Sequence, residues 1–328
     1  MLFENLVSLI DGKLLNQPSI SSFSEIVFDA KKVGIGSLFF GDSEDIDLAL
    51  QNGAYGIVSD KMRVKDKEIA WIKVKDIDDA KLKLLRYFII HHDSYLLFFD
   101  SIELELAKML YHDKDILYIS DIQKAIKTFE ANKKYKIVVV SDETLFKKLN
   151  LPQYEIVLKH HLTFYKWTNF VSTFTYRENL YKDVKFSAIF QDKLERVLNC
   201  FDNFELEYKL ERVGFLKHFK PIFLDKDFRV VGFGQSRKVF IVESEEKYFD
   251  DEIDFLLKNS SWAKIAVLLP KKSKLKVEDM DDVFYYKSYD DILKLDLFRY
   301  NFVIMIDHKV GFENFLDKIN SDIKDTLF

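Results

Sequence analysis

The chain has 328 residues, of which 48% are hydrophobic, and its formal net charge is −5. This length and composition allow a substantial core and two or three domains, which excludes an intrinsically disordered protein. The acidic balance excludes the broad basic surface that nucleic-acid binding requires, so we expect no nucleic-acid partner.

The cysteine content and the N-terminus indicate a cytoplasmic protein. Cys200 is the single cysteine and cannot form an internal disulfide, which fits a reducing compartment. The first residues, MLFENLVSLIDGK, lack the cationic segment of a secretory signal, and Glu4 and Asp11 interrupt their apolar stretch. No apolar run approaches the roughly 20 residues that span a bilayer, so we expect no membrane insertion.

The first half of the chain alternates short apolar runs with amphipathic stretches, a pattern typical of α/β folds. Strands are expected at 37–40, 55–60, 70–76 and 94–100, and again at DILYIS and YKIVVVSD. Helices are expected at 46–54, after the cap Asp76, at IELELAKMLYH and at IQKAIKTFEANKK.

The second half begins with aromatic and polar residues that alternate from Leu162 to Phe190, which predicts antiparallel hairpin strands. A helix around KLERVLNCF follows, and its apolar face should bury Cys200. Strands are then expected at RVVGF, KVFIVES, AKIAVLLP and NFVIMID, with helices at DEIDFLLKNS, SYDDILKL and FENFLDKI. Strand–helix–strand alternation predicts an α/β fold with mostly parallel sheets.

Clusters of titratable residues give no sign of a catalytic or metal site. The adjacent histidine pairs at 91–92 and 160–161 point apart on any regular element, so we expect no metal centre. The aspartate pairs at 250–251, 281–282 and 290–291 are expected to cap helices, since carboxylates suit helix N-termini.

A glycine-containing stretch carries a resemblance to a known family. FDAKKVGIGSLFF (residues 28–40), followed by ALQNGAYGIVSD and IKVKDIDDAKLKLLRYF, resembles the N-terminal domain of the Mur ligases. These enzymes are ATP-dependent amide ligases that extend the peptide of the peptidoglycan precursor, and MurE and MurF are the nearest members. The matching residues are Asp29, Val33, Gly36, Leu38, Phe39, Gly53, Ala54 and Val58. Ala30 and Lys31 replace the serine and arginine of the family pattern.

The resemblance implies a three-part architecture. Residues 1–92 would form the N-terminal domain that holds the UDP moiety, 93–220 a reduced central domain, and 221–328 a Rossmann-like C-terminal domain. The segment NFVIMIDHKVGF resembles the family's closing segment, with Asp307, His308 and Lys309 at its Lys-Gly-Ser turn.

The resemblance also implies that Asp29, Lys31 and Gly36 contact the uridine nucleotide. Glycines let backbone N–H groups approach an acceptor, and a neighbouring cation suits phosphate. The alternative is a tight structural turn with solvated lysines.

The family's ATP phosphate loop is absent from the matching position. Mur ligases place a glycine-rich Gly-Lys-Thr turn between a strand and a helix, whereas this chain has Asp100, Ser101, Ile102 and Glu103 there. Like charges about 4 Å apart cost about 1 kcal/mol even in water. We therefore expect no ATP in the family's manner, no cofactor and no catalytic residue.

A second glycine-rich segment, GFGQSRK (232–238), precedes a strand and not a helix, so it lacks the helix N-terminus of a phosphate loop. We interpret it as a hairpin turn in which Arg237 and Lys238 form an alternative anion site.

These features favour a shortened, degenerate and non-catalytic relative of the Mur ligases, a bacterial pseudoenzyme linked to peptidoglycan precursor synthesis or cell shape. Its expected partners are the UDP-MurNAc-peptide precursor or a Mur or other cell-wall enzyme. Two alternatives stay open. One is a divergent MurF-like ligase that joins UDP-MurNAc-tripeptide to D-Ala-D-Ala through a rebuilt nucleotide site. The other is a purely structural interaction protein.

Overall fold

The computed structural model describes residues 1–62, 64–131, 133–277, 280–308 and 311–325. The chain divides into two compact units. Unit 1 comprises Met1–Leu104 and His112–Glu155, and unit 2 comprises Glu105–Tyr111 and Ile156–Phe328. Each unit is described by itself below. The three-part division at residues 92 and 220 stays a prediction.

Unit 1 begins with a five-stranded sheet in the order β1-β5-β4-β3-β2, parallel except for β1. Its elements are α1 (Phe3–Leu9), β1 (Lys13–Leu14), β2 (Ile26–Val27), the 3-10 turn η1 (Ala30–Lys32), β3 (Leu38–Phe40), η2 (Ser43–Asp45), α2 (Ile46–Gln51), β4 (Gly56–Ser59) and β5 (Ala70–Lys73). The strands β3 and β4 are buried along their whole length, as expected of parallel strands covered on both faces.

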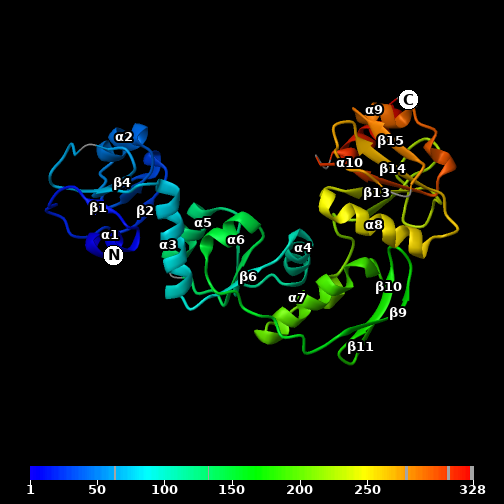
Figure 1. Ribbon diagram of the computed structural model, residues 1–328, viewed down its shortest axis with the longest axis horizontal. Helices are drawn as coiled ribbons and strands as arrows, with labels where there is room; N and C mark the ends of the chain where they lie inside the picture. The colour runs from blue at the N-terminus through cyan, green and yellow to red at the C-terminus, as the bar shows by residue number, and fades with distance from the viewer. Residues whose placement is uncertain (63, 132, 278–279, 309–310, 326–328) are drawn as a thin grey trace. The chain divides into compact units, whose positions relative to one another are not determined.

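The rest of unit 1 is a three-stranded parallel sheet in the order β6-β8-β7. Its elements are α3 (Ile77–His91), β6 (Tyr95–Phe98), the first turn of α4 (Ser101–Leu110), β7 (Ile116–Ile119), α5 (Ile122–Glu130), β8 (Ile137–Val140) and α6 (Glu143–Leu149). The rest of α4, from Glu105 on, belongs to unit 2. Figure 1 shows α5 and α6 beside β6. Buried residues of both sheets and of α3 form one hydrophobic cluster, which joins the two sheets into one unit.

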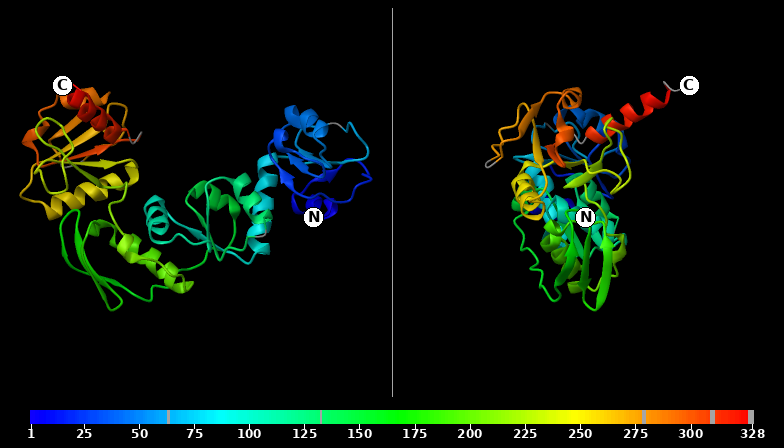
Figure 2. Two further views of the ribbon diagram at one scale, coloured as in Figure 1. Left: turned by 180° about the vertical axis from the view of Figure 1, so that it is seen from behind. Right: turned by 90° about the vertical axis from the view of Figure 1, so that its right-hand side faces the viewer.

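Unit 2 starts with an antiparallel sheet in the order β11-β10-β9. Its elements are β9 (Leu162–Trp167), β10 (Ser172–Tyr176), β11 (Asn179–Val184), η3 (Ala188–Phe190), α7 (Gln191–Asn203) and η4 (Leu210–Arg212). The helix α7 runs alongside this curved sheet in Figure 1 and in the left view of Figure 2. Cys200 is fully buried on α7, as the apolar face of the predicted helix indicates.

The C-terminal part of unit 2 is a five-stranded sheet in the order β12-β13-β16-β14-β15, in which only the pairing of β12 with β13 is antiparallel. Its elements are β12 (Lys220–Phe223), β13 (Val239–Glu243), α8 (Glu246–Asn259), β14 (Ile265–Pro270), β15 (Val283–Tyr286), α9 (Tyr289–Leu293), η5 (Leu297–Arg299), β16 (Phe302–Ile306) and α10 (Phe312–Asp325). Side chains from one face of this sheet form a core with Ile292 of α9 and with Phe312 and Leu316 of α10.

The α/β class expected from the pattern is confirmed, with three local corrections. The segment RVVGF is not a strand, because only Val230 makes an isolated bridge, to Leu224; the strand that precedes the hairpin is β12. The pattern analysis also missed α1, β1, β2, α6, β12 and β15. Among the aspartate pairs, Asp291 forms a capping box with Ser288, whereas the pair at 250–251 lies inside α8 and the pair at 281–282 precedes a strand.

Within the described ranges, the structure contains no helix whose length and apolar character would let it span a lipid bilayer.

Candidate functional sites

The turn between β6 and α4, where the resemblance places ATP phosphate, is closed by two carboxylates. The Asp100 backbone N–H donates to Glu103 Oε2 at 2.9 Å, and the Glu103 N–H donates to Asp100 Oδ1, also at 2.9 Å. This reciprocal arrangement is a capping box, and Glu103 is only 3% exposed. A helix N-terminus attracts anions through its free N–H groups and its dipole. Here two anions of the chain already use that end of α4.

The glycine loop of unit 1 uses its backbone donors within the chain. The Gly34 N–H donates to Ser37 Oγ at 3.1 Å, and the Gly36 N–H donates to the Gly53 carbonyl at 3.2 Å. Gly36 has φ +90°, a conformation that favours glycine, and a Cβ there would lie 3.1 Å from Ser24 Oγ. Gly36 therefore has a structural reason to be glycine, whereas Gly34 has no such requirement.

Of the two residues beside the glycine loop, Asp29 caps a turn and Lys31 is exposed to solvent. Asp29 accepts a hydrogen bond from the Lys31 N–H at 3.0 Å and thereby caps η1. The Lys31 side chain is exposed. Because the Gly34 and Gly36 donors are occupied, a ligand at this loop would depend on side chains such as Lys31. The roles of Asp29, Lys31 and Gly36 in ligand binding stay a prediction.

A pocket of about 430 Å³ adjoins the glycine loop inside unit 1. Its walls come from the chain start before α1, from the segment around β2 and from the C-terminal ends of α3 and α5. The lining residues are Met1, Phe23, Ser24, Glu25, Ile26, Tyr87, Phe88, His91, His92, Lys127, Phe129, Glu130 and Ala131. The connection to the loop is direct, since the Ser24 N–H donates to the Gly36 carbonyl at 2.9 Å. We call it the loop pocket.

The loop pocket combines aromatic rings with charged groups. Lys127 Nζ lies 2.7 Å from Glu25 Oε2 and 3.3 Å from Glu130 Oε2. Tyr87 stacks on His91 with ring centroids 5.2 Å apart. Burial, with the neighbouring His91 adding to it, lowers the pKa of His92. Sequence reasoning missed this pocket because its walls come from four separated segments.

Arg237 and Lys238, the alternative anion site, lie in the connection between the antiparallel strands β12 and β13. Lys238 Nζ donates to the Tyr300 carbonyl at 2.8 Å, and Arg237 is exposed. The segment thus lies between two antiparallel strands, as the hairpin interpretation expects, but the connection is long and begins at β12 and not at RVVGF. Its anion-binding role stays a prediction.

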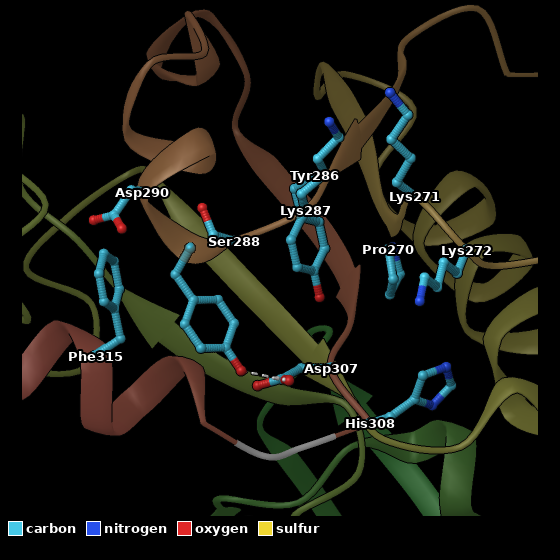
Figure 3. Close-up of a pocket in the computed structure, with 11 residues that line it drawn as sticks. Pro270, Lys271, Lys272, Tyr286, Lys287, Ser288, Asp290, Asp307, His308 and Phe315 are labelled. Carbon is cyan, nitrogen blue, oxygen red and sulfur yellow. Dashed lines mark hydrogen bonds between the residues drawn. The ribbon is translucent and has the colours of Figure 1, made fainter.

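A larger pocket, of about 700 Å³, lies at the carboxyl ends of the parallel strands β14, β15 and β16. Its lining, drawn in Figure 3, consists of Pro270, Lys271, Lys272, Tyr286, Lys287, Ser288, Tyr289, Asp290, Asp307, His308 and Phe315. Ligands of open α/β sheets commonly bind at this edge. We call it the lysine pocket.

The floor of the lysine pocket is held by hydrogen bonds to Asp307, which is 2% exposed. Its Oδ1 accepts from the Tyr289 hydroxyl, and its Oδ2 accepts from the Gly311 and Phe312 N–H groups, all at 2.8 Å. Burial, together with the neighbouring Asp307, raises the pKa of Tyr289. Asp307 thus caps α10, which explains an acid at the family's Lys-Gly-Ser turn. Lys309, in the same turn, lies outside the described residues.

The lysines of this pocket could have been noticed in the sequence. The run KKSKLK (271–276) directly follows the buried strand IAVLLP, at the edge where parallel strands present ligand-binding loops. The convergence of Lys287 and His308 on the same place depends on strand order and has no local signal.

A buried group of acids and a histidine lies where β13 meets α8. Glu243 and Glu252 are both 0% exposed, and His218 Nδ1 lies 2.8 Å from Glu243 Oε1. Burial and the nearby Glu243 raise the pKa of Glu252 well above its ordinary value. Burial also disfavours the charge on Glu243, but the hydrogen bonds from His218 and other neighbours outweigh it and lower the pKa of Glu243.

Within the described residues, no three histidine, cysteine, aspartate or glutamate side chains gather closely enough to hold a metal ion.

Comparison with known proteins decides the fold. No protein-family model matches the sequence, and no curated protein matches it. The MurF ligase of Thermotoga maritima, solved in complex with ADP, superposes with a TM-score of 0.58 over 92% of this chain and 98% of that chain, at 10% identity. The chain has the Mur ligase fold.

Two further structures agree. MurF of Acinetobacter baumannii superposes with a TM-score of 0.57 over 96% of this chain and 98% of that chain, at 10% identity. The UDP-N-acetylmuramoylalanyl-D-glutamyl-2,6-diaminopimelate–D-alanyl-D-alanyl ligase of the same organism superposes with a TM-score of 0.55 over 97% of this chain and 98% of that chain, at 8% identity. At such identities the likeness concerns the Mur ligase fold alone.

Proposed function

We propose that this chain is a non-catalytic, cytoplasmic Mur-ligase-like protein that acts by binding, in peptidoglycan precursor synthesis or in cell shape. The observation that carries the proposal is the capping box of Asp100 and Glu103 at the start of α4. A Mur ligase would need an open, positive backbone at this turn, and the chain places two carboxylates there.

Electrostatics weighs against a triphosphate at this turn. An anion about 4 Å from a carboxylate is repelled by about 1 kcal/mol in water and by about 4 kcal/mol near a protein surface. The turn from Phe99 to Leu104 contains no lysine, arginine or glycine to offset the repulsion. Moving the Glu103 side chain out of this turn would cost free energy, because it is buried and accepts a hydrogen bond from the Asp100 N–H.

The proposed ligand is the UDP-MurNAc-peptide precursor, held by unit 1. The exposed Lys31 supplies a positive charge for the diphosphate. The adjoining loop pocket supplies the half-buried ring of Tyr87 as an aromatic surface for a base, and its size suits a nucleotide. A Mur or other cell-wall enzyme is the alternative partner.

The catalytic question is tested by titrating the purified chain with Mg²⁺–ATP in a calorimeter, and by assaying phosphate release with UDP-MurNAc-tripeptide and D-Ala-D-Ala. We expect neither ATP heat nor phosphate release. An authentic MurF ligase assayed in parallel establishes that the substrates are active. ATP-dependent phosphate release would instead support the divergent ligase.

The binding question is tested by titrating UDP-MurNAc-tripeptide into the wild type and into Lys31→Glu/Lys32→Glu. We expect binding to the wild type and at least a tenfold weaker affinity for the variant. The matched control, Lys61→Glu/Lys67→Glu, changes the charge equally on exposed residues of the same unit and should bind as the wild type does. A folded wild type that binds no precursor would leave the purely structural interaction protein as the better description.

A further inference from the structure

We infer that the lysine pocket of unit 2 is a second ligand site, which takes an organic phosphate such as a nucleoside diphosphate. The inference goes beyond the function proposed above, because it concerns neither the glycine loop nor the loop pocket of unit 1. It stands on a cavity, on the three lysines that line it and on an aromatic wall.

The three lysines are gathered by the sheet itself. Lys271 follows β14 and Lys287 follows β15, and these strands pair in parallel up to Pro270 and Tyr286. The Lys271 N–H also donates to the Tyr286 carbonyl at 2.8 Å, which keeps the two strand ends together. In Figure 3 the ammonium groups of Lys271 and Lys287 extend to the same rim of the pocket, and Lys272 lies on the side nearer His308.

These lysines are not neutralised by acids in the part of the chain that the structure describes. Lys271, Lys272 and Lys287 form no ion pair with any described residue. The other basic side chain, His308, is occupied: its Nδ1 lies 3.1 Å from the Ser244 carbonyl, and its Nε2 lies 3.2 Å from Glu246 Oε1. Three neighbouring positive charges repel one another, and a ligand with two or more negative charges relieves that repulsion.

The opposite wall suits the organic part of such a ligand. Tyr289 and Phe315 both line the pocket, and their ring centroids lie 5.3 Å apart. Asp290 lies on this side, away from the lysines, where its carboxylate can accept from hydroxyl or amino groups. Asp307 does not oppose the lysines freely, because both its oxygens already accept hydrogen bonds.

The residue types favour phosphate over carboxylate. Planar carboxylates are typically bound by the forked guanidinium of arginine, whereas lysine is a compact charge that serves phosphate well. The lining contains three lysines and no arginine. A volume of about 700 Å³ accommodates a ligand of nucleotide size.

The test uses the full chain with the unit 1 loop disabled, so that failure of the proposed function cannot mimic failure of this inference. In Lys31→Glu/Lys32→Glu, pyrophosphate, UDP and citrate are titrated by calorimetry. We expect pyrophosphate and UDP to bind, UDP at least threefold more tightly. Adding Lys271→Gln, Lys272→Gln and Lys287→Gln should weaken the binding of pyrophosphate and of UDP at least tenfold. Adding Lys226→Gln, Lys258→Gln and Lys264→Gln, exposed lysines of unit 2 outside the pocket, should change affinity less than twofold.

Four results would overturn the inference. The first is the absence of pyrophosphate and UDP binding at millimolar concentration, and the second is an equal loss of affinity in the pocket variant and in the control variant. The third is tighter binding of citrate than of UDP. The fourth is equal affinity for pyrophosphate and UDP. This fourth result would mean that the aromatic wall does not contact the ligand. Circular dichroism of each variant establishes that it is folded before its affinity is interpreted.

Discussion

The surroundings of the buried Glu252 side chain determine which protonation state of its carboxyl group is favoured. Neither of its carboxyl oxygens accepts a hydrogen bond from any residue that the structure describes, and it is 0% exposed. An ionised carboxylate there would be very costly, so burial and the neighbouring Glu243 favour the protonated form and raise the pKa of Glu252. Glu243 in turn accepts from His218 and from the Ser244 and Glu245 N–H groups, which stabilise its charge.

Glu252 should make unit 2 less stable as pH rises. Its pKa in the folded chain is raised, so its favourable contribution is fully present below the unfolded value near 4.5 and is lost as pH rises through the folded value. We expect Glu252→Gln, which keeps a donor but does not titrate, to flatten this loss and to increase the free energy of unfolding at pH 8. Urea unfolding between pH 5 and pH 9 measures it.

The control for Glu252 is Asp254→Asn, an exposed acid on the same helix. Its unfolding free energy should keep the wild-type slope against pH. An unchanged slope in Glu252→Gln would mean that this carboxyl is ionised in the folded protein.

The two glycines of the unit 1 loop should respond differently to alanine. Gly36 has φ +90° and a crowded Cβ position, so Gly36→Ala should cost about 1–3 kcal/mol of stability. Gly34 has no such backbone requirement, and its nearest neighbour would lie 4.0 Å from a Cβ, so Gly34→Ala should change stability by less than about 1 kcal/mol. Equal losses in chemical denaturation would refute the turn geometry described above.

At the scale of single elements, carboxylate caps explain where several helices begin. Asp76 accepts from the N–H groups of Asp78 and Asp79 at 2.8 and 3.0 Å, and Asp121 accepts from the Lys124 N–H at 2.7 Å. The cap at Asp100 belongs to the same class, with Glu103 added. What distinguishes α4 is its place in the Mur ligase fold, where the resemblance calls for a phosphate loop.

We expect Asp100→Ala and Asp121→Ala to destabilise the chain by similar amounts, about 0.5–2 kcal/mol each, since both remove a helix cap. Thermal or urea unfolding of the two variants provides the comparison. We also expect Asp100→Ala to gain no ATP binding, because removing one carboxylate supplies no lysine or glycine. Micromolar ATP affinity in this variant would show that the acid alone had closed an otherwise competent site.

Helices and strands were predictable where local pattern and tertiary environment agree. The strands β3 and β8 are continuous apolar runs, β4 and β13 are apolar up to their last residue, and each of the four is buried throughout. The prediction failed at RVVGF, whose apolar residues resemble a strand, because the pairing partner of β13 is the earlier segment KPIF. It failed at α6 and β15 because they bury little: Leu149 is the only buried residue of α6, and Tyr286 the only one of β15.

At the scale of the whole molecule, each unit encloses its own hydrophobic core, so unfolding should not be a single two-state transition. Gly36→Ala should lower the transition of unit 1. Ile304→Val, which removes a methylene from the fully buried strand β16, should lower that of unit 2 by about 0.5–1.5 kcal/mol. Calorimetry of the two variants and their combination tests this. A single transition that both variants lower equally would mean that the units unfold together.

The Mur ligase fold persists at 8–10% identity because a fold depends on the burial pattern more than on particular residues. Site chemistry has no such tolerance, since one acid in place of a lysine reverses a charge. The likeness in fold therefore coexists with the capping box at α4.

The sequence by itself determined the α/β class, the capped helices and the turn without a phosphate loop, because these depend on residues within a few positions of one another. Only the tertiary structure decided that Lys271, Lys287 and Phe315 line one pocket, and that His218, Glu243 and Glu252 share one buried site. Strand order brings these distant residues together, and local periodicity carries no information about that order.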